Sequence, residues 1–132
     1  MKHHVIAIIE SFEQGTVPEA FALARLQEVT GRTVDSDWLR NYWRSESRED
    51  FVDRLCAEAI PDCERITDSD ALALIAEYLQ TDSPGRRDSI EAALDRRYGK
   101  PIGTVSDLVF QRDLSVPGRI LEELKKDTRI YL

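Results

Sequence analysis

Residues 5–31 read VIAIIESFEQGTVPEAFALARLQEVTG, and this stretch decides the fold class. The apolar residues of its first part recur at the i, i+3, i+4 and i+7 spacing of one helix face. They are Val5, Ile8, Ile9 and Phe12. Gly15 ends this helix, Pro18 opens a second one, and Gly31 stands where a helix C-terminal glycine is expected. The stretch therefore predicts two helices joined by a short loop.

The same periodicity continues along the chain. Further helices are predicted over residues 47–60, 67–79, 83–98, 104–109 and 115–126, the last of them started by Ser115 and Pro117. Ser47 with Asp50, and Thr67 with Asp70, form approximate capping boxes, and Ser83 precedes Pro84 as an N-cap. Either Thr104 or Ser106 is the expected cap of the short helix. No segment alternates with the two-residue period of a strand, which predicts an all-α bundle of six to eight helices.

Length and composition indicate one globular domain over residues 1–132. The chain has 42% hydrophobic and 33% charged residues, which is too apolar for a disordered protein. A chain of this length rarely supports two independent cores. Residues 128–132 favour an extended conformation, either as a frayed end or as an ordered strap.

The net charge of −7 is concentrated in one stretch. Between residues 58 and 82, Arg65 is the only base among seven acids. These acids are Glu58, Asp62, Glu64, Asp68, Asp70, Glu77 and Asp82. Such a surface repels phosphate, so it disfavours nucleic acid and anionic membranes and favours a basic protein partner. Charge runs are also often solvated faces, and Asp68 and Asp70 suit the first turn of a helix in any case.

The expected location is cytoplasmic. The longest strongly apolar run, Val5 to Ile9, is too short to span a bilayer or to form a secretory signal. Cys56 and Cys63 are expected to be reduced thiols, although a disulfide between them across Pro61 stays open.

The sequence favours a protein without catalytic activity. His3 and His4 are adjacent at the N-terminus, where a site is poorly preorganised. Neither a serine elbow nor a phosphate-binding glycine loop is present, and no cofactor or metal site is predicted. Carboxylate pairs such as Asp68 with Asp70 leave glycosidase-type or metal-dependent chemistry open, although such pairs are usually solvated surface.

The segment Trp38–Trp43 is the second candidate feature. On a continuous helix, Trp38 and Tyr42 share one face and Trp43 lies on another, so the helix cannot turn every aromatic residue toward one core. Either both tryptophans belong to the core, or Tyr42 or Trp43 stays exposed as a binding anchor, since aromatic residues dominate interface energetics.

Two segments resemble bacterial immunity proteins that neutralise nuclease toxins, of the colicin D and contact-dependent inhibition kinds. They are IAIIESFEQGTVPEAFALARL, residues 6–26, and ITDSDALALIAEYL, residues 66–79. The resemblance covers about a quarter of the chain. It implies a cytoplasmic helical protein whose acidic surface covers the toxin's substrate-binding cleft. The chain departs from the pattern by continuing for about fifty residues beyond Leu79.

The favoured function is therefore an inhibitor or immunity factor for a basic protein, such as a nuclease toxin. Acids near Asp62 to Asp82 would steer the partner, and an aromatic residue near Trp43 would anchor it. A helix-turn-helix DNA-binding regulator is the main alternative. It would use the Arg-rich segment 86–112, in which Arg86, Arg87, Arg96, Arg97 and Lys100 outnumber Asp88, Glu91 and Asp95 by two. A structural adaptor is the third possibility.

Overall fold

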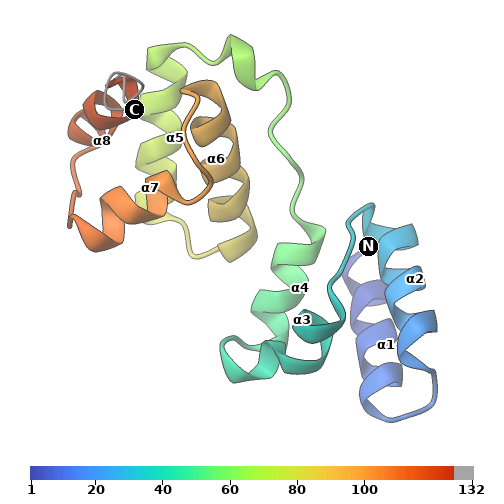
Figure 1. Cartoon of the computed structure of the whole chain (residues 1–132). Helices are drawn as coiled ribbons and strands as arrows, with labels where there is room; N and C mark the ends of the chain where they lie inside the picture. The colour runs from blue at the N-terminus through green and yellow to red at the C-terminus, as the bar shows by residue number, and fades with distance from the viewer. Residues whose placement is uncertain (127–132) are drawn as a thin grey trace. The chain divides into compact units, whose positions relative to one another are not determined.

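The computed structural model describes residues 1–126, and helices are the only regular secondary structure in that part of the chain (Figure 1). The all-α prediction is thus confirmed. The eight α-helices among the described residues also agree with the predicted six to eight. The interpretation of residues 128–132 concerns a segment outside the described residues.

The chain divides into two compact units, Met1–Ala57 and Glu58–Leu132, called here the N-terminal and C-terminal units. Each has its own cluster of buried apolar side chains, and no residue belongs to both clusters. Two clusters therefore replace the single core that the chain length suggested. That residues 1–132 fold as one domain stays a prediction.

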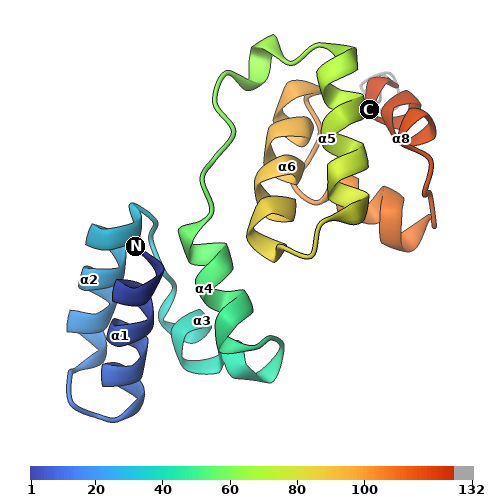
Figure 2. The ribbon, with the colours of Figure 1, turned by 180° about the vertical axis from the view of Figure 1, so that it is seen from behind.

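The N-terminal unit is built on a helical hairpin. Helices α1 (Lys2–Glu13) and α2 (Glu19–Thr30) lie side by side, and α1 also contacts α4 (Arg48–Cys56) (Figures 1 and 2). Along the chain, α2 is followed by α3 (Ser36–Asn41) and by η1 (Tyr42–Arg44), a single 3-10 turn that precedes α4. Gly31 ends α2 in the left-handed region with φ of 74°, as its position predicts.

Aromatic rings fill the centre of this unit. Phe51 is fully buried on α4, the ring of Tyr42 stacks on it at 4.2 Å, and the ring of Trp38 meets it edge-on at 4.9 Å. Such ring pairs stabilise the fold by on the order of 1 kcal/mol, in addition to the stabilisation that comes from burying their apolar area. The other buried apolar residues around them are Val5, Ile9, Ala22, Leu26, Val34, Leu39, Val52 and Leu55.

The helix predicted over residues 47–60 is shorter in the structure. It begins as expected, because Ser47 Oγ accepts a hydrogen bond from the Asp50 amide at 3.1 Å. It ends at Cys56, because Ala57 adopts an extended backbone and its amide bonds back to Arg54. Residues 57–60 leave the helix where the first unit ends. Ala59 and Ile60 continue the apolar spacing of the helix in the sequence, but this spacing does not extend the helix in the structure.

The C-terminal unit places α5 (Asp68–Gln80) in contact with α6 (Pro84–Arg97) and α8 (Pro117–Lys125) (Figure 2). Short elements complete it: η2 (Cys63–Arg65), α7 (Thr104–Ser106) and the π-helical η3 (Asp107–Gln111). The core is mostly aliphatic. Its buried residues are Ile66, Ala71, Ile75, Tyr78, Ile90, Ala93, Leu94, Val105, Leu108, Ile120, Leu121 and Leu124.

The predicted helix starts of this unit have mixed outcomes. Thr67 and Asp70 form a complete capping box, and Ser83 caps α6 with Pro84 in its first turn, as predicted. The prediction that Thr104 or Ser106 caps the short helix is wrong, since the N-cap of α7 is Gly103 with φ of 94°. The backbone amides at that end of α7 donate hydrogen bonds to the side chain of Asp95 on α6, and local sequence cannot indicate such a contact.

Candidate functional site

The aromatic segment does not form one continuous helix. Because α3 ends at Asn41 and a 3-10 turn follows, Tyr42 turns inward and is only 4% exposed. Its hydroxyl donates a 2.8 Å hydrogen bond to Glu13, and burial, followed by this bond, raises the pKa of Tyr42 to about 12. Trp38 is half-buried against Phe51. Tyr42 and Trp38 thus contribute to the core, and only Trp43 is available as an anchor.

Trp43 presents its ring to solvent and is 62% exposed. Its indole N–H donates to the Arg40 carbonyl at 2.8 Å, so its polar atom already has a partner within the chain. The guanidinium carbon of Arg44 lies 5.2 Å from the centre of the ring. The exposed part of the side chain is therefore an apolar ring next to a cation, and these two residue types are enriched at energetically dominant contacts.

Three of the seven acids of the sequence stretch are paired with bases from other helices. Glu64 lies 3.3 Å from Arg96, and Asp68 lies 2.6 Å from Lys125 and accepts a 3.0 Å hydrogen bond from the Tyr98 hydroxyl. These donors, Lys125 before Tyr98, lower the pKa of Asp68. Burial, followed by its bond to Asp68, raises the pKa of Tyr98 to about 12.

The third pair joins Glu77 of α5 to Arg86 of α6 through two hydrogen bonds. One runs from Nη2 to Oε1 at 3.0 Å and the other from Nε to Oε2. Hydrogen bonding from Arg86 lowers the pKa of Glu77. The excess of acid in the linear sequence is thus partly balanced by bases that only the tertiary structure brings to it.

The remaining acids do not gather in one patch. Asp70 is used in the capping box with Thr67. Glu58, Asp62 and Asp82 are exposed and make no ion pair with any residue from 1 to 126. Asp62 precedes the thirteen-residue α5 and Asp82 follows it, so the length of that helix, about 20 Å, lies between the two positions. Any steering of a partner would therefore act over a broad surface.

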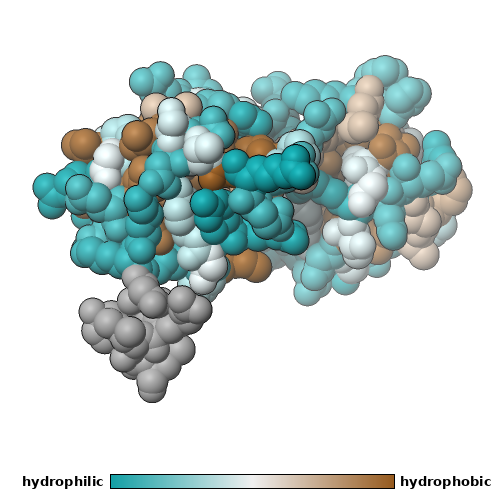
Figure 3. Space-filling model, turned by 90° about the horizontal axis from the view of Figure 1, so that it is seen from above, coloured by the Kyte–Doolittle hydropathy of each residue, from teal (hydrophilic) through white to brown (hydrophobic). Residues whose placement is uncertain are grey.

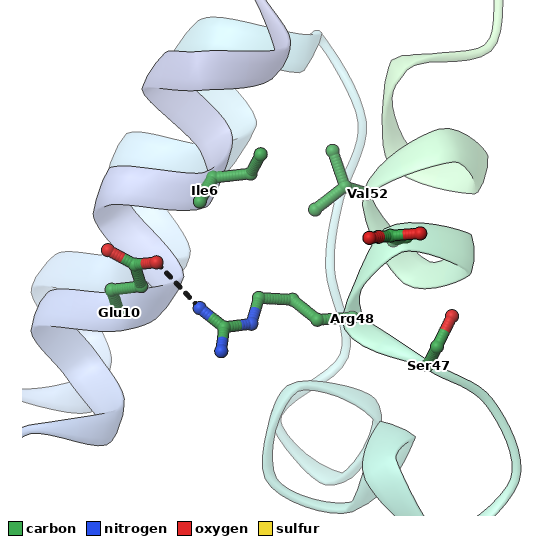
Figure 4. A pocket seen from close by; sticks show the side chains of 6 residues that line it. Ile6, Glu10, Ser47, Arg48 and Val52 are labelled. Atoms are coloured by element: carbon green, nitrogen blue, oxygen red, sulfur yellow. Dashed lines mark hydrogen bonds and ion pairs between the residues drawn. The ribbon is translucent and has the colours of Figure 1, made fainter.

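A groove in the N-terminal unit was not anticipated from the sequence. It has a volume of about 550 Å³, and its lining comes from α1, from α4 and from the residue before α4. Ile6 and Val52 point toward each other across it, and Arg48 reaches from α4 to Glu10 on α1 with an Nη1–Oε1 distance of 2.7 Å (Figure 4). Ser47 and Glu49 complete the lining. The available signal was the i, i+4 spacing of Ile6 and Glu10, which puts an acid beside the apolar face.

The bases of the Arg-rich segment mostly have partners within the C-terminal unit. Besides Arg86 and Arg96, Arg87 donates to the Thr81 carbonyl at 2.6 Å and Arg97 to the Ile66 carbonyl at 2.7 Å. Lys100 donates to the Lys126 carbonyl. These side chains bind the unit together and are not presented as a row of free cations.

Two carboxylates of α6 hold the start of α7. Asp95 is 2% exposed and accepts hydrogen bonds from the amides of Gly103 at 3.0 Å and Val105 at 3.3 Å. Glu91, one turn earlier, accepts from both the amide and the hydroxyl of Ser106. Burial raises the pKa of Asp95 to about 6 despite these bonds, and the Glu91 charge adds to the shift. The sequence places both residues among the Arg side chains of a surface helix, and it does not reveal this role because a buried acid resembles a surface acid in a polar helix.

Among residues 1–126, no group of three or more histidine, cysteine or acidic side chains is placed to hold a metal ion. Cys56 and Cys63 are free thiols. In the same range, every helix is too short or too polar to cross a membrane. Figure 3 shows apolar side chains as separate patches among hydrophilic ones on the face that it presents.

Comparison with known proteins finds no matching family model, no matching curated protein and no matching solved structure. The resemblance to immunity proteins therefore stays a prediction.

Proposed function

We propose that this chain is a non-enzymatic protein-binding factor that inhibits a basic protein, as an immunity factor does for a nuclease toxin. The observation that carries the proposal is Trp43, a large apolar ring that is 62% exposed and whose N–H is already bonded. Covering this ring removes apolar area from water and leaves no polar atom of the indole without a partner. This combination favours a protein contact over catalysis.

The charge distribution supports a basic partner. Residues 1–57 contain ten acids and seven bases, and residues 58–132 contain fifteen acids and eleven bases. Both units are thus acidic, and Glu58, Asp62 and Asp82 keep carboxylates that no base in residues 1–126 neutralises. A positively charged partner would be attracted to either unit, and the attraction would weaken as salt rises.

The alternative of a DNA-binding regulator has less support. Arg86, Arg87 and Arg97 donate to partners within the unit, and moving them to phosphate groups would break these bonds. A regulator would also bring a chain of net charge −7 close to a polyanion. A structural adaptor would share the exposed ring but would not require a basic partner.

Affinity capture from the lysate of the source organism tests the proposal. The tagged chain is incubated at low and at high salt, and the proteins that it retains are identified by mass spectrometry. We expect a stoichiometric basic protein that Trp43→Ala retains about 30-fold less well, because aromatic anchors are typical hot spots. Phe110→Ala is the matched control, since Phe110 is a 65% exposed aromatic residue in the other unit.

A second set of variants tests whether negative charge attracts the partner. Glu58→Gln, Asp62→Asn and Asp82→Asn together remove three charges without breaking an ion pair, and Asn tolerates the left-handed φ of 53° at Asp62. We expect slower association at low salt, and a smaller decrease from the equally neutralising set Asp107→Asn, Asp113→Asn and Glu122→Gln, since net charge alone accounts for part of the attraction. Equal retention by the wild type and Trp43→Ala, or recovery of DNA in place of protein, would contradict the proposal.

A further inference from the structure

We propose that the groove between α1 and α4 binds a cationic side chain, arginine or lysine, of the basic polypeptide partner. The inference rests on the proposed function, because it takes the partner to be a basic protein, and it adds the position and chemistry of one contact. The groove volume of about 550 Å³ lies in the range of ligand sites, so it can hold a long side chain with its neighbouring backbone.

The lining of the groove matches a side chain with an apolar stem. Ile6 from α1 and Val52 from α4 face each other across the opening (Figure 4). Val52 is 2% exposed and Ile6 is half-buried, so the packing of the unit fixes their positions. The methylene groups of lysine or arginine can lie against the accessible part of Ile6, next to Val52, while their charged end stays near the mouth of the groove.

The charged groups of the lining select a cation. Glu10 bonds Arg48 through one carboxylate oxygen, Oε1. Glu49, in the first turn of α4, is exposed and has no ion-pair partner in residues 1–126. The groove therefore contains two carboxylates and one guanidinium, and its net charge is negative. An incoming cation would bond Glu49 and add to the Glu10–Arg48 pair without replacing it.

Other occupants fit this lining less well. A purely apolar segment would remove the Glu49 carboxylate from water without giving it a partner, which is costly. A phosphate group or an acidic side chain would meet two carboxylates. A cation on an aliphatic stem is the chemistry that satisfies both the apolar and the acidic part of the lining.

A small probe tests the inference without any partner protein. Butylguanidinium, which has a four-carbon stem and a guanidinium head, is titrated into isotope-labelled full-length protein while methyl and amide signals are followed by NMR. We expect weak, saturable shifts at Ile6 and Val52. Pentanoate, with a similar stem and a carboxylate head, should leave these signals unchanged.

Glu49→Gln is the decisive variant, since it keeps the size of the side chain and removes the charge. We expect about fivefold weaker binding of butylguanidinium, as for loss of one exposed ion pair. Glu122→Gln, at an exposed acid in the other unit, should bind like the wild type. Equal shifts with pentanoate, unchanged affinity in Glu49→Gln, or shifts that avoid Ile6 and Val52 would overturn the inference.

The outcomes separate this inference from the proposed function. If a basic protein is captured through Trp43 but butylguanidinium does not bind the groove, the groove inference fails and the proposed function stands. If butylguanidinium binds as expected but no basic protein is captured at either salt, the groove recognises cations and the proposed function fails.

Discussion

The two units of the chain achieve stability by different means. In the N-terminal unit, the stacked ring of Tyr42 and the edge-on ring of Trp38 surround Phe51. In the C-terminal unit the core is mostly aliphatic, and the two buried polar or charged residues of the described chain, Ser89 and Asp95, both lie there. The contrast is that ring packing fills the centre of one unit, whereas in the other the buried Asp95 carboxylate of α6 accepts hydrogen bonds from two backbone amides.

The largest expected effect comes from Phe51→Ala. Removing a fully buried phenyl ring should lower the free energy of unfolding by about 3–5 kcal/mol. Trp38 and Trp43 both belong to the N-terminal unit, so tryptophan fluorescence reports on that unit and far-UV circular dichroism on the whole chain. We expect the fluorescence transition to move to lower denaturant concentration.

The same variant tests how independent the units are. If each unfolds by itself, part of the dichroism transition should stay at its wild-type midpoint. If the two probes shift together, the chain unfolds as one cooperative domain, which agrees with the single domain that its length and composition predict. Phe110→Ala, at a 65% exposed ring, serves as the control and should change stability by less than about 0.5 kcal/mol.

The second prediction concerns Asp95 and pH. Its folded-state pKa is raised from 3.8 to about 6, so the folded protein binds a proton more tightly than the unfolded chain. The contribution of Asp95 to the free energy of unfolding is therefore largest below the unfolded pKa. It falls by up to about 3 kcal/mol as pH rises toward 6, and stays at that lower level above it.

Asp95→Asn isolates this contribution. Asparagine keeps a carbonyl oxygen for the Gly103 or Val105 amide but does not titrate in this range. Denaturant unfolding followed by circular dichroism from pH 4 to pH 7 should show a smaller fall in stability for this variant than for the wild type. Parallel curves for the two proteins would show that Asp95 titrates normally and would remove the contrast drawn between the units.

Helix caps provide a matched pair of smaller effects, one in each unit. Thr67→Ala removes the capping box of α5, and Ser47→Ala removes the N-cap of α4. Each should cost about 1 kcal/mol. Ser47→Ala should lower the midpoint of the unfolding transition that tryptophan fluorescence follows. Thr67→Ala should lower mainly the midpoint of the transition that circular dichroism follows. A fluorescence shift of equal size in both variants would again indicate a single cooperative transition.

The smallest effect is expected at the ion pair between Glu64 and Arg96. Both side chains are about 70% exposed, so solvent screens the attraction. A double-mutant cycle with Glu64→Gln and Arg96→Gln should give a coupling below about 0.5 kcal/mol, decreasing with salt. A coupling several times larger would show that surface pairs do stabilise the C-terminal unit.

Local sequence rules could not predict which aromatic residue is exposed or which residues line the groove. The exposure of an aromatic residue near Trp43 was one of two alternatives, because a helix cannot turn every aromatic residue of this segment inward. The choice between Tyr42 and Trp43 depended on where α3 ends and on Glu13, which lies on another helix. The groove joins Ile6 to Val52, two positions that no short-range pattern connects.

By itself, the sequence determined the helical class of this protein and most helix starts, because a 3.6-residue apolar period and a capping side chain act within one or two turns. Only the tertiary structure decided that Glu64, Asp68 and Glu77 are paired, that Asp95 is buried and that two apolar clusters form. The physical reason is the distance along the sequence over which each kind of interaction acts. A residue's period and cap depend on its chain neighbours, whereas its burial and ion pairs depend on side chains that folding brings from elsewhere.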